Sequence, residues 1–261
     1  MGFFGNALLA GSCIAVASGL IGWFVVLRGQ VFAGDALSHV AFTGALAAAA
    51  AGLDLRTGLF LATVLVALLL AVLGSRALAD DVTIGIVFVW VLGLGVLCLS
   101  LLNAGAGGAN GTIAARTLFG SIFGLSAGAA RLAALIAAGL VVAVLALGRP
   151  LLLASIDAPL AGARGLPVRG LGVAFLALLG VYAAEATQAV GALLLLGLLA
   201  APAGAAHRLT ASPYRGMALA VGIALLSMWS GLALGYWITA LPPGSAVILV
   251  ASGCYALTMV L

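Results

Sequence analysis

The stretch that decides the fold is Arg28-Gly-Gln-Val-Phe-Ala-Gly-Asp35-Ala-Leu-Ser38-His39, which leads into a long apolar segment. Asp35 and His39 are four residues apart, so a helix would place both side chains on one face. A charged side chain inside a membrane is costly, and ionisable residues there usually mark a functional site. The stretch therefore predicts a membrane-spanning helix that carries a polar site.

The composition is that of an integral membrane protein. Of the 261 residues, 66% are hydrophobic and 6% are charged, whereas soluble domains carry about 25% charged residues. The mean hydropathy is +1.38. The ten basic residues are all arginines and are scattered singly, so they form no patch of the kind that binds nucleic acid. We expect an all-α protein in contact with membrane lipid, with residues 1–261 forming one transmembrane domain.

Apolar runs between charges and helix breakers predict a compact polytopic bundle of about nine spans, or eight if one weak run is not a span. The weakest runs lie around 169–206, where Glu185 and Gln188 indicate either a short turn or a polar point at membrane depth. The predicted spans are 7–27, 31–52, 57–77, 83–102, 128–148, 169–184, 188–206, 215–238 and 244–261.

Nine spans place the two termini on opposite sides of the membrane, and the arginines decide between the two orientations. With the N-terminus outside and the C-terminus inside, more arginines lie at the inner ends of the spans, as the positive-inside rule requires. The inner group is Arg28, Arg76, Arg149, Arg164, Arg169, Arg208 and Arg215, and the outer group is Arg56, Arg116 and Arg131.

Asp35 and His39 form the candidate site. Asp35 follows the inner end of its span by about seven residues, and His39 lies about 6 Å further along the axis at 1.5 Å per residue. The two side chains could form a structural hydrogen bond, or relay protons, because histidine titrates near neutral pH. They could equally bind a passing metal ion, since carboxylate oxygen and imidazole nitrogen both suit Zn²⁺ or Mn²⁺. Their spacing does not separate these three interpretations.

Two other ionisable residues are weaker candidates. Glu185 is predicted near the outer face, in a solvated turn, with a place where metal enters as the alternative. His207 is predicted at the cytoplasmic end of a span, in contact with lipid headgroups or loop carbonyls, with a place where metal leaves as the alternative. The glycine-rich residues 103–112 are not followed by the Gly-Lys-Ser/Thr of a nucleotide-binding loop. We therefore expect a protein that is not an enzyme and has no ATPase site of its own.

The longest connection predicted in the cytoplasm, residues 149–167, contains a short helix. Asp157 is a suitable N-cap with Pro159 in the first turn, and Gly165 is a suitable C-terminal stop. These signals predict about two helical turns over 157–165. Such a helix either closes a loop or docks into a partner.

Short motifs follow one another along nearly the whole chain. They are Gly34-Asp35-Ala-Leu-Ser38-His39 with Gly44; Leu118-Phe-Gly120-Ser; Asp157-x-x-x-Ala161-x-x-x-Gly165-Leu-Pro; Val190-Gly191-Ala-Leu-Leu with Ala201-Pro202-Ala; and Pro243-Gly244-Ser-Ala-Val-Ile-Leu. In content and order they resemble the transmembrane permeases of the bacterial zinc/manganese-type metal-ion ABC importers. The chain departs from that pattern at Thr43, where proline is common, and at Ala205-Ala206-His207, where Ala-Thr-Ala is more usual.

The resemblance implies an importer of Zn²⁺ or Mn²⁺ in the bacterial cytoplasmic membrane that works by alternating access. It implies two permease copies, two cytoplasmic ATPase subunits that bind ATP, and an extracytoplasmic metal-binding protein. It places Asp35 and His39 in the translocation path, and Asp157, Ala161 and Gly165 in the segment that couples to the ATPase. The alternatives are a permease for metal chelates, siderophores or cobalamin, a proton-coupled secondary carrier, and a membrane protein with no transport role.

Overall fold

The computed structural model describes residues 2–74, 81–105, 110–193, 195–238 and 241–260, and within these ranges its regular elements are all helices. They are α1 (Phe3–Leu27), α2 (Val31–Ala50), α3 (Leu55–Leu73), α4 (Asp81–Gly105), α5 (Asn110–Phe119), the 3-10 turn η1 (Ile122–Gly124), α6 (Ala127–Ile156), α7 (Ala158–Ala163), α8 (Val168–Ala189), α9 (Leu195–Leu209), α10 (Pro213–Trp237) and α11 (Pro243–Val260). Among the described helices, eight are long and apolar enough to cross a membrane: α1, α2, α3, α4, α6, α8, α10 and α11. The prediction of an all-α polytopic bundle is confirmed.

The predicted seventh span, 188–206, is wrong as a continuous helix of membrane length. α8 runs past Glu185 to Ala189, and α9 begins only at Leu195 and has 15 residues. Glu185 does not end the helix because an ion pair neutralises its charge inside the bundle. Residues 75–77 of the predicted third span lie outside the described residues.

The chain breaks instead at Gly191, where two of the sequence motifs meet. The amide N–H groups of Ala192 and Leu193 donate to the carbonyls of Thr117 and Leu118, at 3.0 and 3.2 Å. Gly191 has a φ of +100°, and a Cβ there would lie 2.4 Å from the carbonyl oxygen of Leu118. Only glycine satisfies both the left-handed backbone and this close approach. The motifs Leu118–Ser121 and Val190–Leu193 therefore form one backbone junction.

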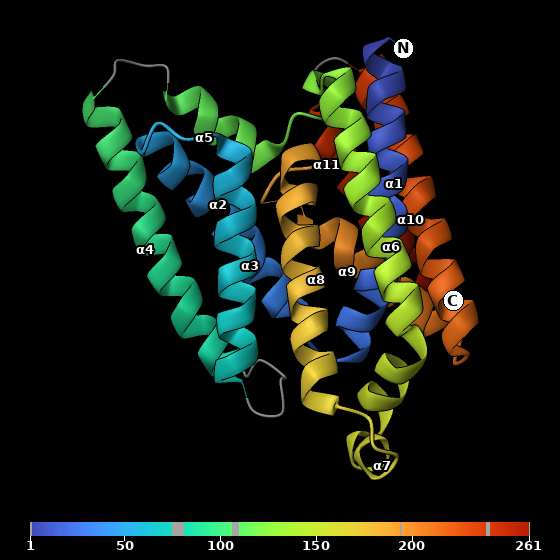
Figure 1. Ribbon diagram of the computed structural model, residues 1–261. Coiled ribbons are helices and arrows are strands. Elements are labelled where there is room, and N and C mark those ends of the chain that lie inside the picture. The colour runs from blue at the N-terminus through green and yellow to red at the C-terminus, as the bar shows by residue number, and fades with distance from the viewer. Residues whose placement is uncertain (1, 75–80, 106–109, 194, 239–240, 261) are drawn as a thin grey trace.

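The helices differ in how far they are buried. α1 lies inside the bundle, packed against α6, α9 and α10, whereas most residues of α4 are exposed. Figure 1 shows α4 at one edge of the bundle, and it shows α7 at the end opposite the N-terminus. Because the exposed faces of the eight long helices are rich in large apolar side chains, these faces suit contact with lipid.

A buried chain of hydrogen bonds links α8, α1 and α9 close to Pro202, which lies inside α9. Pro202 has no N–H, so the carbonyl of Leu198, four residues earlier, loses its usual partner within the helix. The hydroxyl of Ser18 donates to that carbonyl at 2.9 Å, and the hydroxyl of Tyr182 donates to Ser18 at 2.8 Å. Since Ser18, Tyr182 and Leu198 are all buried, this chain of hydrogen bonds holds α9 against α1 and α8.

Replacing Ser18 by alanine is expected to destabilise the protein more than replacing Tyr182 by phenylalanine. Ser18→Ala leaves the Tyr182 hydroxyl and the Leu198 carbonyl buried without partners, at about 1–3 kcal/mol for each group. Tyr182→Phe leaves the bond from Ser18 to Leu198 in place. Thermal unfolding of the purified protein in detergent measures the difference. Ser230→Ala is the control, because Ser230 bonds only within its own helix; equal midpoints for Ser18→Ala and this control contradict the proposed network.

Candidate functional site

The corner between α1 and α2 places the candidate site just inside the bundle. Gly29, with a φ of +65°, ends α1, and the amide of Gln30 donates to the carbonyl of Val25 at 2.9 Å. This is the hydrogen-bond pattern of a glycine C-cap, which reverses the chain direction sharply. Arg28 fastens the corner to α6 by donating to the hydroxyl of Ser155 at 3.2 Å. α2 then begins at Val31 and carries the motif residues inward.

Asp35 and His39 lie on α2, and both side chains are partly exposed. In the described part of the chain, no ion pair or hydrogen bond joins them, although their spacing allows one. The interpretation as a structural Asp–His hydrogen bond therefore has no support in this structure. Among the described residues, no cluster of three or more potential metal-ligating side chains occurs. One copy of the chain thus supplies two candidate ligands from α2, and further ligands have to come from elsewhere.

α4 covers one side of the candidate site. The ring of Phe88 meets the imidazole of His39 edge to face, with centroids 5.2 Å apart and planes at 70°. The same ring meets Phe32 at 6.0 Å. Further along, the hydroxyl of Thr43 donates to the carbonyl of Val91 at 3.2 Å. The sequence motif contained the histidine but no sign of this aromatic neighbour, because the two lie on different helices.

Glycines allow the other helices to approach α2 closely. A Cβ on Gly34, next to Asp35, would lie 2.7 Å from Cδ2 of Leu199 in α9. A Cβ on Gly44 would lie 2.5 Å from the carbonyl oxygen of Gly58 in α3. Small residues let helix backbones pack this closely in membranes. Two glycines of the motif, Gly34 and Gly44, therefore set the walls around the Asp35–His39 segment.

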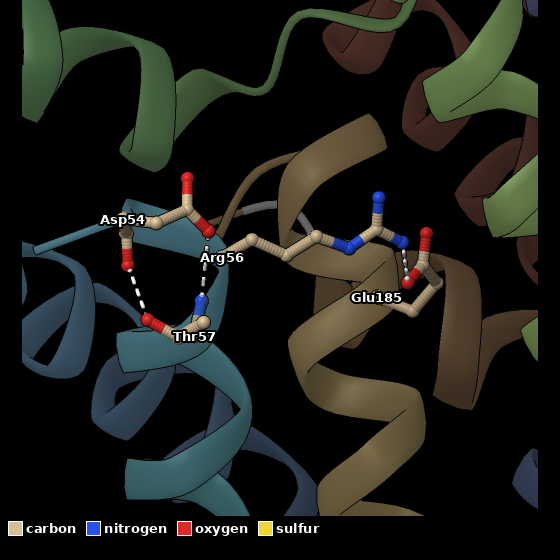
Figure 2. A network of polar contacts seen from close by, with 4 residues as sticks. All are labelled: Asp54, Arg56, Thr57 and Glu185. Atoms are coloured by element: carbon tan, nitrogen blue, oxygen red, sulfur yellow. Dashed lines mark hydrogen bonds and ion pairs between the residues drawn. The ribbon is translucent and has the colours of Figure 1, made fainter.

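Glu185 is not in a solvated turn, so that prediction is wrong. Its carboxylate accepts a hydrogen bond from Nη2 of Arg56 at 2.8 Å, and the Glu185 side chain is 3% exposed (Figure 2). Arg56 extends from the first turn of α3 to the last turns of α8, and its guanidinium also lies 5.7 Å from the centroid of the Phe60 ring. Because the Glu185 carboxylate is bound to Arg56, it is not a free metal ligand in this state. The sequence predicted both Arg56 and Glu185 near the outer face of the membrane, and this shared depth is the observation from which the ion pair could have been predicted.

A cavity of about 310 Å³ adjoins this ion pair. It lies where α3 begins, next to the junction of the two backbone motifs. Its polar lining residues are Asp54, Arg56, Thr117, Ser121 and Gln188. The Asp54 carboxylate caps α3 by accepting from the amide of Thr57 at 3.2 Å, as Figure 2 shows. The rest of its lining is apolar or glycine, so the cavity is of mixed character.

His207 contacts a carbonyl group, as the sequence favoured, but the carbonyl belongs to a helix. Its Nε2 lies 3.0 Å from the backbone oxygen of Trp23 in α1, and its ring stacks on the Trp23 ring at 4.9 Å. Asp35 and His39 lie on a different helix, and no contact joins His207 to either of them in the described residues. A role for His207 in metal release stays a prediction.

α7 forms as predicted, and its caps are the predicted residues. The Asp157 carboxylate accepts from the amide of Leu160 at 2.9 Å. Gly165, with a φ of +78°, ends the helix, and the amide of Leu166 donates to the carbonyl of Ala161 at 3.1 Å. Ala161 is fully buried. The helix is therefore a defined element at the end of the bundle opposite the N-terminus (Figure 1).

Comparisons with known proteins agree along the whole chain. The model of the ABC 3 transport family matches residues 1–261. The manganese import system permease protein ScaB of Streptococcus parasanguinis is 28% identical over 248 residues, which cover 95% of this chain and 86% of ScaB. The manganese transport system membrane protein MntC of Halalkalibacterium halodurans is 28% identical over 253 residues, which cover 97% of this chain and 85% of MntC.

Solved structures have the same fold. The structure of PsaBC from Streptococcus pneumoniae in complex with Fab contains a chain that superimposes with a TM-score of 0.84 at 25% identity, covering 99% of this chain and 91% of that one. An inward-facing transporter, provisionally described as of the metal-chelate ABC type, superimposes with a TM-score of 0.73 at 16% identity, covering 98% of this chain and 85% of that one. The second likeness shows the fold alone.

Proposed function

On the premise that the chain belongs to the ABC 3 transport family, we propose that it is the permease of an ATP-driven importer of a divalent transition-metal ion, Mn²⁺ or Zn²⁺. The observation that carries this proposal is the Asp35–His39 pair. Both side chains lie on a helix long and apolar enough to span a membrane, and they do not hydrogen-bond to each other. The manganese permeases among the relatives support the choice of a metal ion as substrate.

The ligand chemistry fits a metal that passes through. A carboxylate oxygen and an imidazole nitrogen suit Mn²⁺ and Zn²⁺, and no thiolate is needed for either ion. With two protein ligands from one copy, the remaining coordination positions are filled by water, a backbone carbonyl or a second copy of the chain. Such a partial set holds an ion weakly enough to release it, as conduction requires.

The complete importer consists of two permeases, each a single transmembrane domain, two cytoplasmic ATPase subunits and an extracytoplasmic metal-binding protein. α7 is the coupling helix: Asp157 caps it, Ala161 anchors it to the bundle and Gly165 ends it. ATP-driven closure of the ATPase pushes on α7 and changes the side to which Asp35 and His39 are open. In this arrangement the α7 end is cytoplasmic, and the N-terminus and the cavity beside Arg56 face the outside of the cell.

Two other transport functions make different demands. A permease for metal chelates, siderophores or cobalamin binds an organic shell around the metal and does not need an Asp–His pair. A proton-coupled carrier works without an ATPase. Glu185 and His207 favour neither of these functions. In this state the Glu185 carboxylate contacts Arg56, and the His207 ring nitrogen contacts the Trp23 carbonyl.

Reconstitution in proteoliposomes together with its ATPase and binding protein tests the function. We expect uptake of free Mn²⁺ or Zn²⁺ that requires ATP on the ATPase side and the delivery protein on the other. A proton ionophore should leave uptake unchanged. Uptake driven by a pH gradient without the ATPase would instead identify a carrier, and uptake of a chelate that free metal does not inhibit would identify a chelate permease.

A further inference from the structure

The aromatic ring of Phe88, on the neighbouring helix α4, lies against the His39 imidazole. Its ring centroid is 5.2 Å from that of the imidazole, with the planes at 70°. Phe88 has no nitrogen, oxygen or sulfur atom in its side chain, so it is not a metal ligand. The edge-to-face arrangement nevertheless restricts how the imidazole rotates, since aromatic rings favour this geometry over most others.

The position of Phe88 depends on contacts between α2 and α4. The hydroxyl of Thr43 donates to the carbonyl of Val91 at 3.2 Å, only three residues along α4 from Phe88. One turn further, Gly95 leaves room for Thr43, because a Cβ there would lie 2.6 Å from its Oγ1. α4 is otherwise largely exposed and packs mainly against α2. These contacts set the register that brings Phe88 onto His39.

We propose that Phe88 is a positioning residue, which holds the His39 imidazole in the rotamer that binds the transported metal and shields that side of the ring from water. The proposal rests on the proposed function, in which His39 is a ligand. A ligand that is held in its bound rotamer loses less conformational freedom when the metal arrives. Loss of the ring therefore weakens metal binding without removing a ligand.

Three variants separate positioning from packing. Phe88→Leu keeps an apolar side chain and removes the ring, whereas Phe88→Tyr keeps the ring. Phe32→Leu is the matched control. The Phe32 ring also meets the Phe88 ring, at 6.0 Å, but it makes no ring contact with the His39 imidazole among the described residues, and it is 38% exposed. The measurement is Mn²⁺ uptake by the reconstituted importer as a function of Mn²⁺ concentration.

For Phe88→Leu we expect the half-saturating Mn²⁺ concentration to rise about 3- to 10-fold, the range that one aromatic contact supports, while the maximal rate is kept. Phe88→Tyr should restore the wild-type value, and Phe32→Leu should match the wild type. A wild-type half-saturating concentration in Phe88→Leu overturns the proposal. So does a lowered maximal rate shared by Phe88→Leu and Phe32→Leu, which would assign both rings to packing.

The same assay keeps this inference apart from the proposed function. If His39→Ala transports Mn²⁺ normally, His39 is not a ligand, and the part of the proposed site that Phe88 would serve fails. If His39→Ala is defective while Phe88→Leu is normal, the site stands and the positioning role alone is wrong.

Discussion

Asp35→Ala and His39→Ala are each expected to abolish metal uptake while leaving the protein folded. Each change removes one of the two candidate ligands that the structure places on α2. Changing even the groups that orient metal ligands commonly lowers affinity or activity by about 10- to 100-fold, so loss of a ligand should lower uptake by at least that much. The measurement is Mn²⁺ and Zn²⁺ uptake into proteoliposomes that contain the complete importer.

Ser38→Ala is the matched control for these variants. Ser38 lies between the two ligands on the same helix, is buried, and donates to the backbone oxygen of Asp35 at 2.7 Å. Because this bond stays within the helix, its loss should leave uptake near the wild-type level. Normal uptake in both Asp35→Ala and His39→Ala would rule out the site. Mn²⁺ binding to the purified permease separates a relay from a metal site, since a relay would lose transport in these variants but keep metal binding.

Arg56→Ala is expected to destabilise the protein by about 3 kcal/mol, more than Glu185→Gln does. Removing one partner of a buried ion pair leaves the other charge uncompensated, which costs about 3–5 kcal/mol. Arg56 is 22% exposed and Glu185 only 3% exposed. The lower end of the range therefore applies to Arg56→Ala. Glu185→Gln leaves a guanidinium that still reaches solvent, so its effect should be smaller.

Thermal unfolding in detergent, analysed as a double-mutant cycle, measures this asymmetry. The double variant Arg56→Ala with Glu185→Gln should recover most of the stability that Arg56→Ala loses, because no unpaired carboxylate then remains. Arg131→Ala is the control, since Arg131 is exposed to solvent or lipid. Equal midpoints for Arg56→Ala and Arg131→Ala would show that the pair contributes nothing to stability.

Locally encoded features were predicted well from the sequence. The helix over 157–165 was recognised because its cap and its stop are chemical properties of Asp157 and Gly165, and α7 indeed uses both residues. The family resemblance, based on short motifs in a fixed order, is confirmed by a family model that matches the whole chain. Hydrophobic runs likewise predicted the long helices, because the membrane demands uninterrupted apolar segments whatever lies beside them.

Features that depend on a distant partner were not predicted. For Glu185 the sequence left open a short turn or a polar point at membrane depth and favoured the solvated turn, and only the approach of Arg56 from α3 decides for the buried position. For the same reason the sixth predicted span ended too early and the seventh began too early. The contact of Thr43 with Val91 of α4 likewise became visible only in the folded chain.

The sequence by itself determined that this protein is a helical membrane bundle, where most of its helices lie, and which two side chains on α2 are candidate ligands. These properties depend on the chemistry of single residues and on the period of one helix. Only the tertiary structure decided that Asp35 and His39 do not bond to each other, that Phe88 lies against His39, and that Arg56 neutralises Glu185. Such contacts join residues far apart in the chain, and their geometry arises only when the helices pack.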